Sequence, residues 1–285
     1  MTSTTYDIAT SPKARRASGY RWQDNGWVRE PDMADGAFGA MGGIETTAND
    51  YARWVAFLLS AWPARDEPDT GPVARASVRE IVQGSNFVTT SMRRPEIGGA
   101  PCRQAVAYGM AWRVVSDCDL GTVLTHGGGF PGYGSNVLLL PDKGVGVFVF
   151  TNRTYSGPSI PAFKAALAMK AAHEIADRDT PVSARVAAGY AVAKTIWASG
   201  DVAVVQASLA MNFLMDRDVP HWKAELARVK AEVGACAASE PVQGDSAMQG
   251  TFVWRCEHGR IQGTLLLAPT PEPALQALEF AVAKP

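Results

Sequence analysis

The sequence predicts an α+β protein in which an antiparallel sheet packs against helices, followed by a small α+β region at the C-terminus. An amphipathic helical segment precedes several strand-like segments joined by short turns, and such turns favour antiparallel neighbours. Alanine-rich helical segments then follow, and two more strand-like segments come after them. With 285 residues, the chain suits one large domain or two modest ones, and we place the boundary between 1–177 and 178–285.

The first helix is predicted from its cap and from its apolar face. Thr47 and Asp50 have the spacing of a capping box, with Asp in place of the usual Glu. Apolar side chains then recur on one helical face, at Tyr51, Trp54, Val55, Leu58, Leu59 and Trp62. A charged loop ends this helix, and a second helix is expected over 73–83.

The remaining elements are predicted from the spacing of apolar residues and from residues that favour turns. Residues 85–104 are polar and irregular, and Pro141–Gly144 reads as a hairpin turn between two strands. Strands are predicted at 105–115, 121–128, both sides of the turn within 134–152, 250–259 and 260–269. Helices are predicted at 161–177, 182–198, 201–215, 220–235 and from Pro271 onward. The segment 256–260 fits a hairpin turn better than a site.

Composition excludes several classes of function. The net charge is −1 and no basic stripe is visible, which argues against nucleic acid as a partner. The apolar runs are too short for a transmembrane segment, and the N-terminus lacks the apolar stretch of a signal peptide. The four histidines are scattered without metal-ligand spacing, and no phosphate loop is present. We therefore expect neither a metal nor a cofactor.

The four cysteines form two pairs that are local in sequence, Cys102 with Cys118 and Cys236 with Cys256. Neither pair has metal-ligand spacing. Two interpretations remain open: buried free thiols, or two short-loop disulfides in an exported protein. Of the two pairs, Cys236–Cys256 is the better disulfide candidate, because Cys256 lies in a predicted strand.

Residues 123–135 carry the candidate chemistry. His126 ends an apolar run and is followed by Gly127, Gly128 and Gly129, then by an aromatic and glycine-rich turn. One interpretation is a tight connection that contains a histidine. The other is the rim of an acyl-transfer site, where bare backbone lets a substrate carbonyl approach N–H donors. An α/β-hydrolase is excluded, because the chain has no G-x-S-x-G pentapeptide.

His126-Gly127-Gly128 resembles the Lys/His-x-Gly triplet of the serine β-lactamase and penicillin-binding-protein superfamily, in particular its class C-like β-lactamase-related hydrolases. Other segments are similar to that family in the same order. Residues 42–59 resemble its Gly-Gly loop and following helix, 108–112 the strand before the triplet, and 131–152 the two closing strands. The resemblance covers residues 1–177 and implies the C-terminal part of a β-lactamase/transpeptidase-like fold.

The resemblance implies roles for the triplet and its neighbours. His126 would take the position of the family's lysine, and the Gly129 N–H would supply one oxyanion donor beside Gly128. Gly127, Phe130 and Tyr133 would contact the substrate, with the two aromatic rings as pocket walls. The implied reaction is hydrolysis of a small-molecule or peptide acyl substrate (an ester, an amide or a β-lactam-like group) through an acyl-enzyme.

The family's Ser-x-x-Lys and Tyr-x-Asn motifs are absent from residues 1–285. The resemblance therefore implies the C-terminal portion of a longer parent, inactive alone because it lacks the nucleophile. That parent is expected to be exported or periplasmic, and the location of this chain stays open. Strand 145–152 should then have an open edge that favours self-association. The alternative is a non-catalytic binding or scaffold protein that kept the cleft without its nucleophile.

Overall fold

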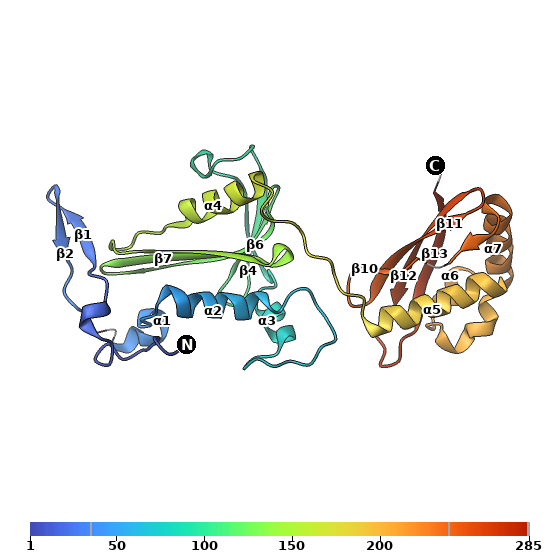
Figure 1. Cartoon of the computed structure of the whole chain (residues 1–285), viewed down its shortest axis with the longest axis horizontal. Coiled ribbons are helices and arrows are strands. Elements are labelled where there is room, and N and C mark those ends of the chain that lie inside the picture. Colours follow the sequence, from blue (N-terminus) through green and yellow to red (C-terminus); the bar gives the residue numbers. More distant parts are fainter. Residues whose placement is uncertain (35, 239, 284–285) are drawn as a thin grey trace. The chain divides into compact units, whose positions relative to one another are not determined.

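The structure is a computed structural model that describes residues 1–34, 36–238 and 240–283. The fold is α+β with antiparallel sheets and packed helices, as predicted (Figure 1). The chain forms two compact units. The first contains Met1–Trp62 and Asp69–Arg178, and the second contains Pro63–Pro68 and the chain from Asp179. Among the described residues, no helix combines the length and the apolar character that a membrane span requires.

A six-stranded antiparallel sheet forms the centre of the first unit, with its strands in the order β3-β4-β5-β6-β7-β8. Each strand pairs with the next one in sequence, because short turns join them. The strands are β3 (Asn86–Met92), β4 (Arg103–Tyr108), β5 (Arg113–Asp117), β6 (Gly121–Phe130), β7 (Tyr133–Leu140) and β8 (Val145–Thr151). β8 lies at one end of the sheet, so one of its edges has no neighbouring strand among the described residues.

Helices cover both faces of this sheet. α2 (Ala48–Leu59) and α3 (Arg75–Ile81) pack on the face that carries Leu124, and α4 (Ser159–Ala171) packs on the face that carries Val123 (Figure 1). Leu124 and Val123 point to opposite faces because side chains alternate along a strand. The apolar face of α2 that the sequence predicts packs against the sheet on the side that carries Leu124.

The start of α2 differs from a complete capping box. Thr47 accepts a hydrogen bond from the Asp50 N–H at 3.2 Å, as predicted. The buried Asp50 carboxylate binds elsewhere, accepting from the Ser3 N–H at 2.7 Å, the Thr4 hydroxyl at 2.9 Å and Arg53 at 2.7 Å. These bonds hold the pKa of Asp50 below its usual value, the Ser3 N–H contributing most. The carboxylate therefore fastens the first residues of the chain to α2.

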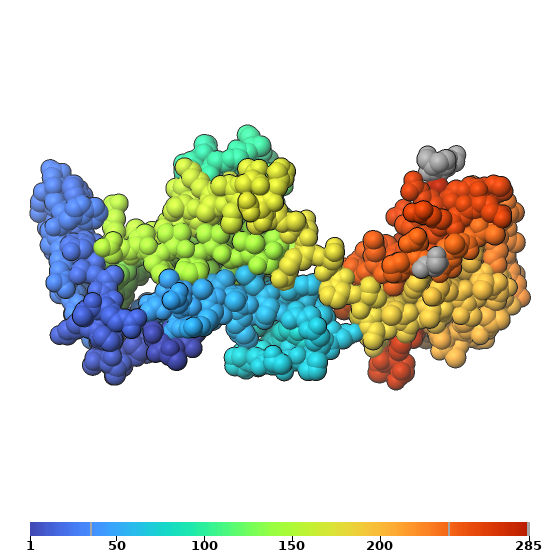
Figure 2. Space-filling model, viewed as in Figure 1, coloured from blue at the N-terminus to red at the C-terminus, as the bar shows by residue number. Residues whose placement is uncertain are grey.

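A two-stranded hairpin precedes these helices. It consists of β1 (Tyr20–Gln23) and β2 (Gly26–Arg29), and it projects from the rest of the first unit (Figure 2). The turn residues Asp24 and Asn25 both have positive φ, as hairpin turns of this length require. The short α1 (Gly39–Gly42) lies between the hairpin and α2.

Two sequence predictions are wrong in the first unit. The segment predicted to be irregular contains β3, an edge strand whose side chains are almost all exposed, so burial leaves no alternating pattern in its sequence. The single strand predicted at 105–115 is two strands, β4 and β5, joined by a turn in which Ala111 has positive φ. Gly109 sits in this turn, where a Cβ would lie 2.6 Å from the carbonyl oxygens of Gln83 and Ile81.

A buried ion network joins Arg93, the residue after β3, to β5 and α4. Asp117, whose side chain is 0% exposed, binds Arg93, whose side chain is 1% exposed. The Asp117 carboxylate also accepts from Gln104 at 2.7 Å and from the N–H groups of Asp119 and Leu120 at 2.9 and 3.0 Å. The partly exposed Asp119 binds both Arg93 at 2.6 Å and Lys170 of α4 at 3.1 Å.

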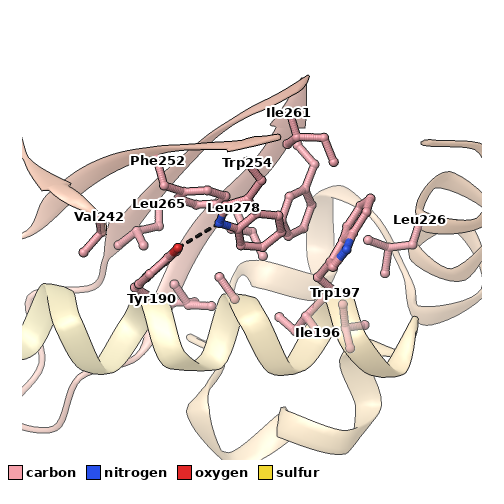
Figure 3. Close-up of a cluster of buried hydrophobic side chains, with 14 of the residues drawn as sticks. Tyr190, Ile196, Trp197, Leu226, Val242, Phe252, Trp254, Ile261, Leu265 and Leu278 are labelled. Carbon is pink, nitrogen blue, oxygen red and sulfur yellow. Dashed lines mark hydrogen bonds between the residues drawn. The ribbon is translucent and has the colours of Figure 1, made fainter. Parts of the chain in front are cut away.

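The second unit packs helices against a five-stranded antiparallel sheet. Its helices are α5 (Ala184–Ser199), α6 (Phe213–Asp216) and α7 (Val219–Val233). Its strands are β9 (Cys236–Ala237), β10 (Gln243–Gly244), β11 (Gln249–Cys256), β12 (Gly259–Leu267) and β13 (Leu275–Ala283). Aromatic rings fill the core, and the buried Trp254 indole N–H donates to the Tyr190 hydroxyl at 2.7 Å (Figure 3). Tyr190 in turn donates to the Glu240 carbonyl at 2.6 Å.

Two helix predictions are wrong in this unit. Residues 201–215 form a kinked 3₁₀ segment, Val202–Ser208, and the short α6 instead of one helix. The 3₁₀ segment ends at Ser208 because Leu209 forms a β-bridge with Leu275 and the Ala210 N–H donates to the Leu275 carbonyl. The helix predicted from Pro271 is instead β13. A register shift near Leu267 leaves Leu275 and Leu278 both buried, and their spacing of three resembles a helical pattern.

Both cysteine pairs are disulfides in the structure, Cys102–Cys118 and Cys236–Cys256. The first joins the segment before β4 to the end of β5. The second joins β9 to β11, at the register pair Cys256↔Cys236. The described residues include no free cysteine.

Candidate active site

The His-Gly-Gly-Gly segment belongs to β6 and lies where the sheet narrows. β5 pairs with β6 only as far as Arg113↔Thr125, whereas β7 continues alongside to Phe130↔Tyr133. From His126 to Gly129, the strand therefore has a neighbouring strand on one side only, within the part of the chain that the structure describes. Alternate residues of a strand direct their N–H and C=O groups to opposite edges. The open edge thus presents unpaired backbone groups beside exposed glycines.

The alternation of side chains sorts the predicted site residues onto two faces. Leu124 packs against α2, so His126, Gly128 and Phe130 share the face of the sheet that α2 covers. Gly127 and Gly129 direct their α-hydrogens to the opposite face. Phe130 lies beside α1, since a Cβ on Gly42 would be 3.7 Å from its ring. The structure thus places His126 and Phe130 on one face of one strand.

Tyr108 is a neighbour of His126 that the sequence analysis did not single out. Its hydroxyl oxygen lies 3.0 Å from Nε2 of His126, and the two rings are edge-on with centroids 6.2 Å apart. Tyr108 ends β4, two strands away from β6 in the sheet. The sequence contains the signal only as the tyrosine of the segment 108–112, and nothing in its spacing indicates that it meets His126.

Polar side chains of β6 and of the neighbouring β7 bind the backbone around His126. The buried Asn136 donates to the His126 carbonyl at 3.2 Å and to Thr125 Oγ1 at 3.4 Å. Thr125 donates to the Val137 carbonyl at 2.7 Å. The Asn136 Oδ1 atom has no hydrogen-bond partner among the residues that the structure describes. These bonds tie the position of His126 to the rigid pairing of β6 with β7.

Close packing explains why side chains are missing along this hairpin. A Cβ on Gly129 would lie 2.9 Å from the ring of Tyr155. A Cβ on Gly134, the partner of Gly129 on β7, would collide with the Ser156 carbonyl oxygen. A Cβ on Gly128 would meet only the Ser135 hydroxyl, at 2.7 Å, and that side chain can rotate away. The glycines therefore serve packing as well as exposure of the backbone.

Tyr133 makes a contact that the sequence did not predict. Its hydroxyl donates to the Ala17 carbonyl at 2.6 Å and so fixes the N-terminal segment against the β6–β7 turn. Burial raises the pKa of Tyr133, and the carboxylates of Asp32 and Glu45 raise it further. The roles of Phe130 and Tyr133 as pocket walls and of Gly129 as an oxyanion donor remain predictions.

Among the described residues, no three His, Cys, Asp or Glu side chains come together as ligands. The groups at hand are one imidazole, one phenol and backbone N–H donors, which suit hydrogen bonding to a carbonyl or oxyanion.

A comparison with protein families shows which family this chain belongs to. The family model described as Beta-lactamase matches residues 1–171, more than half of the chain. The chain belongs to the beta-lactamase family. The match includes the triplet, the helix α2 and both strands that follow the triplet. The resemblance stated from sequence is confirmed at the level of the family.

Solved structures of related folds are similar to the chain over part of their length. A class C β-lactamase from Rhodobacter sphaeroides is 17% identical with a TM-score of 0.39, covering 60% of this chain and 50% of that one. An octameric penicillin-binding protein homologue from Pyrococcus abyssi is 14% identical with a TM-score of 0.43, covering 94% and 53%. The chain thus spans about half the length of the solved structures it matches. A search of curated protein sequences finds no match.

Proposed function

We propose that this chain supplies the His-Gly-Gly side of the acyl-transfer cleft of a serine hydrolase. Its substrates are esters, amides or β-lactam-like acyl groups, and the reaction in the complete enzyme proceeds through an acyl-enzyme. The observation that carries the proposal is the open edge of β6, where exposed glycines present unpaired backbone groups next to His126. Membership of the beta-lactamase family supports the same reaction type.

The chemistry of acyl transfer explains why such an edge is useful. The tetrahedral intermediate carries a negative oxygen, and preorganised N–H donors stabilise it. A substrate carbonyl approaches the strand closely only where Cβ atoms are absent. His126 stands beside this edge and acts on the substrate or on a proton in transit. The nucleophile itself would come from a Ser-x-x-Lys segment, which residues 1–285 do not contain.

The absence of both Ser-x-x-Lys and Tyr-x-Asn from residues 1–285 favours a second candidate, a binding or scaffold protein that retains the cleft without covalent chemistry. The coding sequence upstream of the Met1 codon separates the two. An in-frame Ser-x-x-Lys there supports the hydrolase, and an upstream stop codon or ribosome-binding site supports the binding protein.

Active-site labelling tests the chemistry directly. We expect no stoichiometric labelling of this chain by a fluorescent penicillin or a fluorophosphonate, because the activated serine is missing. Stoichiometric labelling would overturn that expectation. In a longer protein with Ser-x-x-Lys, His126→Ala should lower hydrolysis of a nitrophenyl ester by about 10²–10⁴-fold, as for loss of a proton-transfer group. His258→Gln, an exposed histidine of the second unit, is the control. Equal activity of His126→Ala and the control would contradict the role of His126.

A further inference from the structure

We propose that Tyr108 holds His126 in its neutral Nδ1–H form, so that the rim presents a fixed hydrogen-bond donor to a carbonyl or carboxylate group of the substrate. The tautomer follows from the contact between the two side chains and from the relative donor strengths of their hydrogen-bonding groups. Its use on a substrate rests on the proposed function.

The contact involves one defined nitrogen of the ring. The Tyr108 hydroxyl oxygen lies 3.0 Å from Nε2, within ordinary hydrogen-bond distance. The His126 side chain is exposed, and its Nδ1 has no hydrogen-bond partner among the described residues. Nε2 is therefore occupied by the protein, and Nδ1 is free to contact a ligand.

The scaffold fixes Tyr108 before any ligand binds. Tyr108 pairs with Arg113 of β5 and with Asn86 of β3 at the very end of β4. Immediately after it, the Met110 N–H donates to the Ile81 carbonyl at 2.7 Å and the Gly109 N–H donates to the Trp112 carbonyl at 2.9 Å.

Asn136 fixes the backbone on the histidine side through the His126 carbonyl. The exposed His126 and the half-buried Tyr108 thus meet because the sheet and its turns hold both backbones. A rigid scaffold that places exposed polar groups together is typical of a binding site.

The direction of the hydrogen bond follows from the chemistry of the partners. A phenol O–H is a stronger donor than the N–H of a neutral imidazole, and an unprotonated imidazole nitrogen is a good acceptor. The bond therefore runs from Tyr108 to Nε2, which leaves the proton of neutral His126 on Nδ1. Free histidine favours the Nε2–H form. The Nε2–H form would instead donate to the Tyr108 oxygen, so the tautomer ratio depends on the difference between the two hydrogen bonds. A difference of about 1 kcal/mol changes the ratio by about fivefold, enough to reverse a modest preference.

A donor at this position restricts what the site accepts. The lysine found in the family's triplet offers only donors, whereas a free neutral histidine offers one donor and one acceptor. With its acceptor nitrogen filled by Tyr108, His126 also offers only a donor, without requiring a positive charge. The matching substrate group is an acceptor, either the acyl carbonyl or a carboxylate next to it. Ammonium groups and other pure donors would find no partner at Nδ1.

The tautomer can be measured on this chain as it stands. Long-range ¹H–¹⁵N correlation of the ¹⁵N-labelled protein at about pH 8.5, where histidine side chains are neutral, distinguishes the two ring forms. We expect His126 to be mainly Nδ1–H in the wild type and mainly Nε2–H in Tyr108→Phe. Tyr155→Phe is the matched control, because Tyr155 lies against Gly129 of the same hairpin and its exposed hydroxyl has no hydrogen bond to any described residue. The control should leave the His126 pattern unchanged.

Two results would overturn the proposal: a wild-type His126 that is mainly Nε2–H, or a Tyr108→Phe variant with an unchanged tautomer. Amide spectra of each variant report whether the fold is retained. Because no substrate is involved, the tautomer can be as expected while the labelling and hydrolysis experiments fail. The failure of one proposal is therefore distinguishable from the failure of the other.

Discussion

Replacing Asp117 with Asn should destabilise the first unit more than the same change at Asp119, the other carboxylate of its ion network. The side chains of Asp117 and Arg93 are 0% and 1% exposed, so the guanidinium loses its main counterion in a site that water does not reach. The amide that replaces the carboxylate would also direct N–H groups at two donors, Arg93 and Gln104. Removing one partner of a buried pair costs about 3–5 kcal/mol, and we expect the lower end because Asp119 still binds Arg93.

The assay is urea unfolding with hydrogen exchange of peptides from β5 and β6 as the readout, which assigns the transition to the first unit. A loss of about 3 kcal/mol lowers the midpoint by about 1.5 M if the slope is about 2 kcal/mol per M. Asp119→Asn is the control, because that carboxylate is 30% exposed and should contribute about 1 kcal/mol or less. If Asp117→Asn costs no more than Asp119→Asn, the reasoning about burial is wrong.

The pH dependence gives a second signature of the same carboxylate. Burial alone would raise the pKa of Asp117, but hydrogen bonds from Arg93, Gln104 and two backbone N–H groups outweigh it and lower the pKa below the ordinary 3.8. A group whose pKa is lower in the folded state stabilises the protein fully above the unfolded pKa and loses that contribution as the pH falls. Wild-type stability should therefore decline below about pH 5, and the decline should be shallower in Asp117→Asn.

Three further outcomes test other parts of the structure. Gly134→Ala should lower the free energy of unfolding by about 1–3 kcal/mol, because its Cβ would collide with backbone. Gly128→Ala should lower it less, because its Cβ meets a side chain that can rotate. Equal losses of the two variants in urea unfolding would contradict this. Tyr190→Phe leaves the buried Trp254 N–H without a partner and should lower the stability of the second unit by about 1–3 kcal/mol, and an unchanged transition would refute it. We propose that the open edge of β8 drives self-association. Light scattering should then show oligomers at high concentration and fewer of them in Phe150→Lys, and monodisperse monomer at every wild-type concentration would count against it.

Local pattern was sufficient for the elements whose neighbours lie close in sequence. The apolar face of α2 was predictable because its apolar residues recur with the helical period. The two strands around Pro141–Gly144 were predictable because each is an apolar run that ends at a turn signal. Prediction failed where burial did not follow the period. β3 is exposed at the sheet edge, and the bulge near Leu267 gives β13 a spacing that resembles a helix.

The sequence by itself determined the family, through motifs whose order along the chain is fixed, and it located the glycine segment next to His126. Only the tertiary structure decided what surrounds that segment. The open edge of β6 exists because β5 begins at Arg113, and the contact between Tyr108 and His126 joins residues separated by two strand pairings. Neither can be predicted from spacing, because the register between strands depends on the whole sheet.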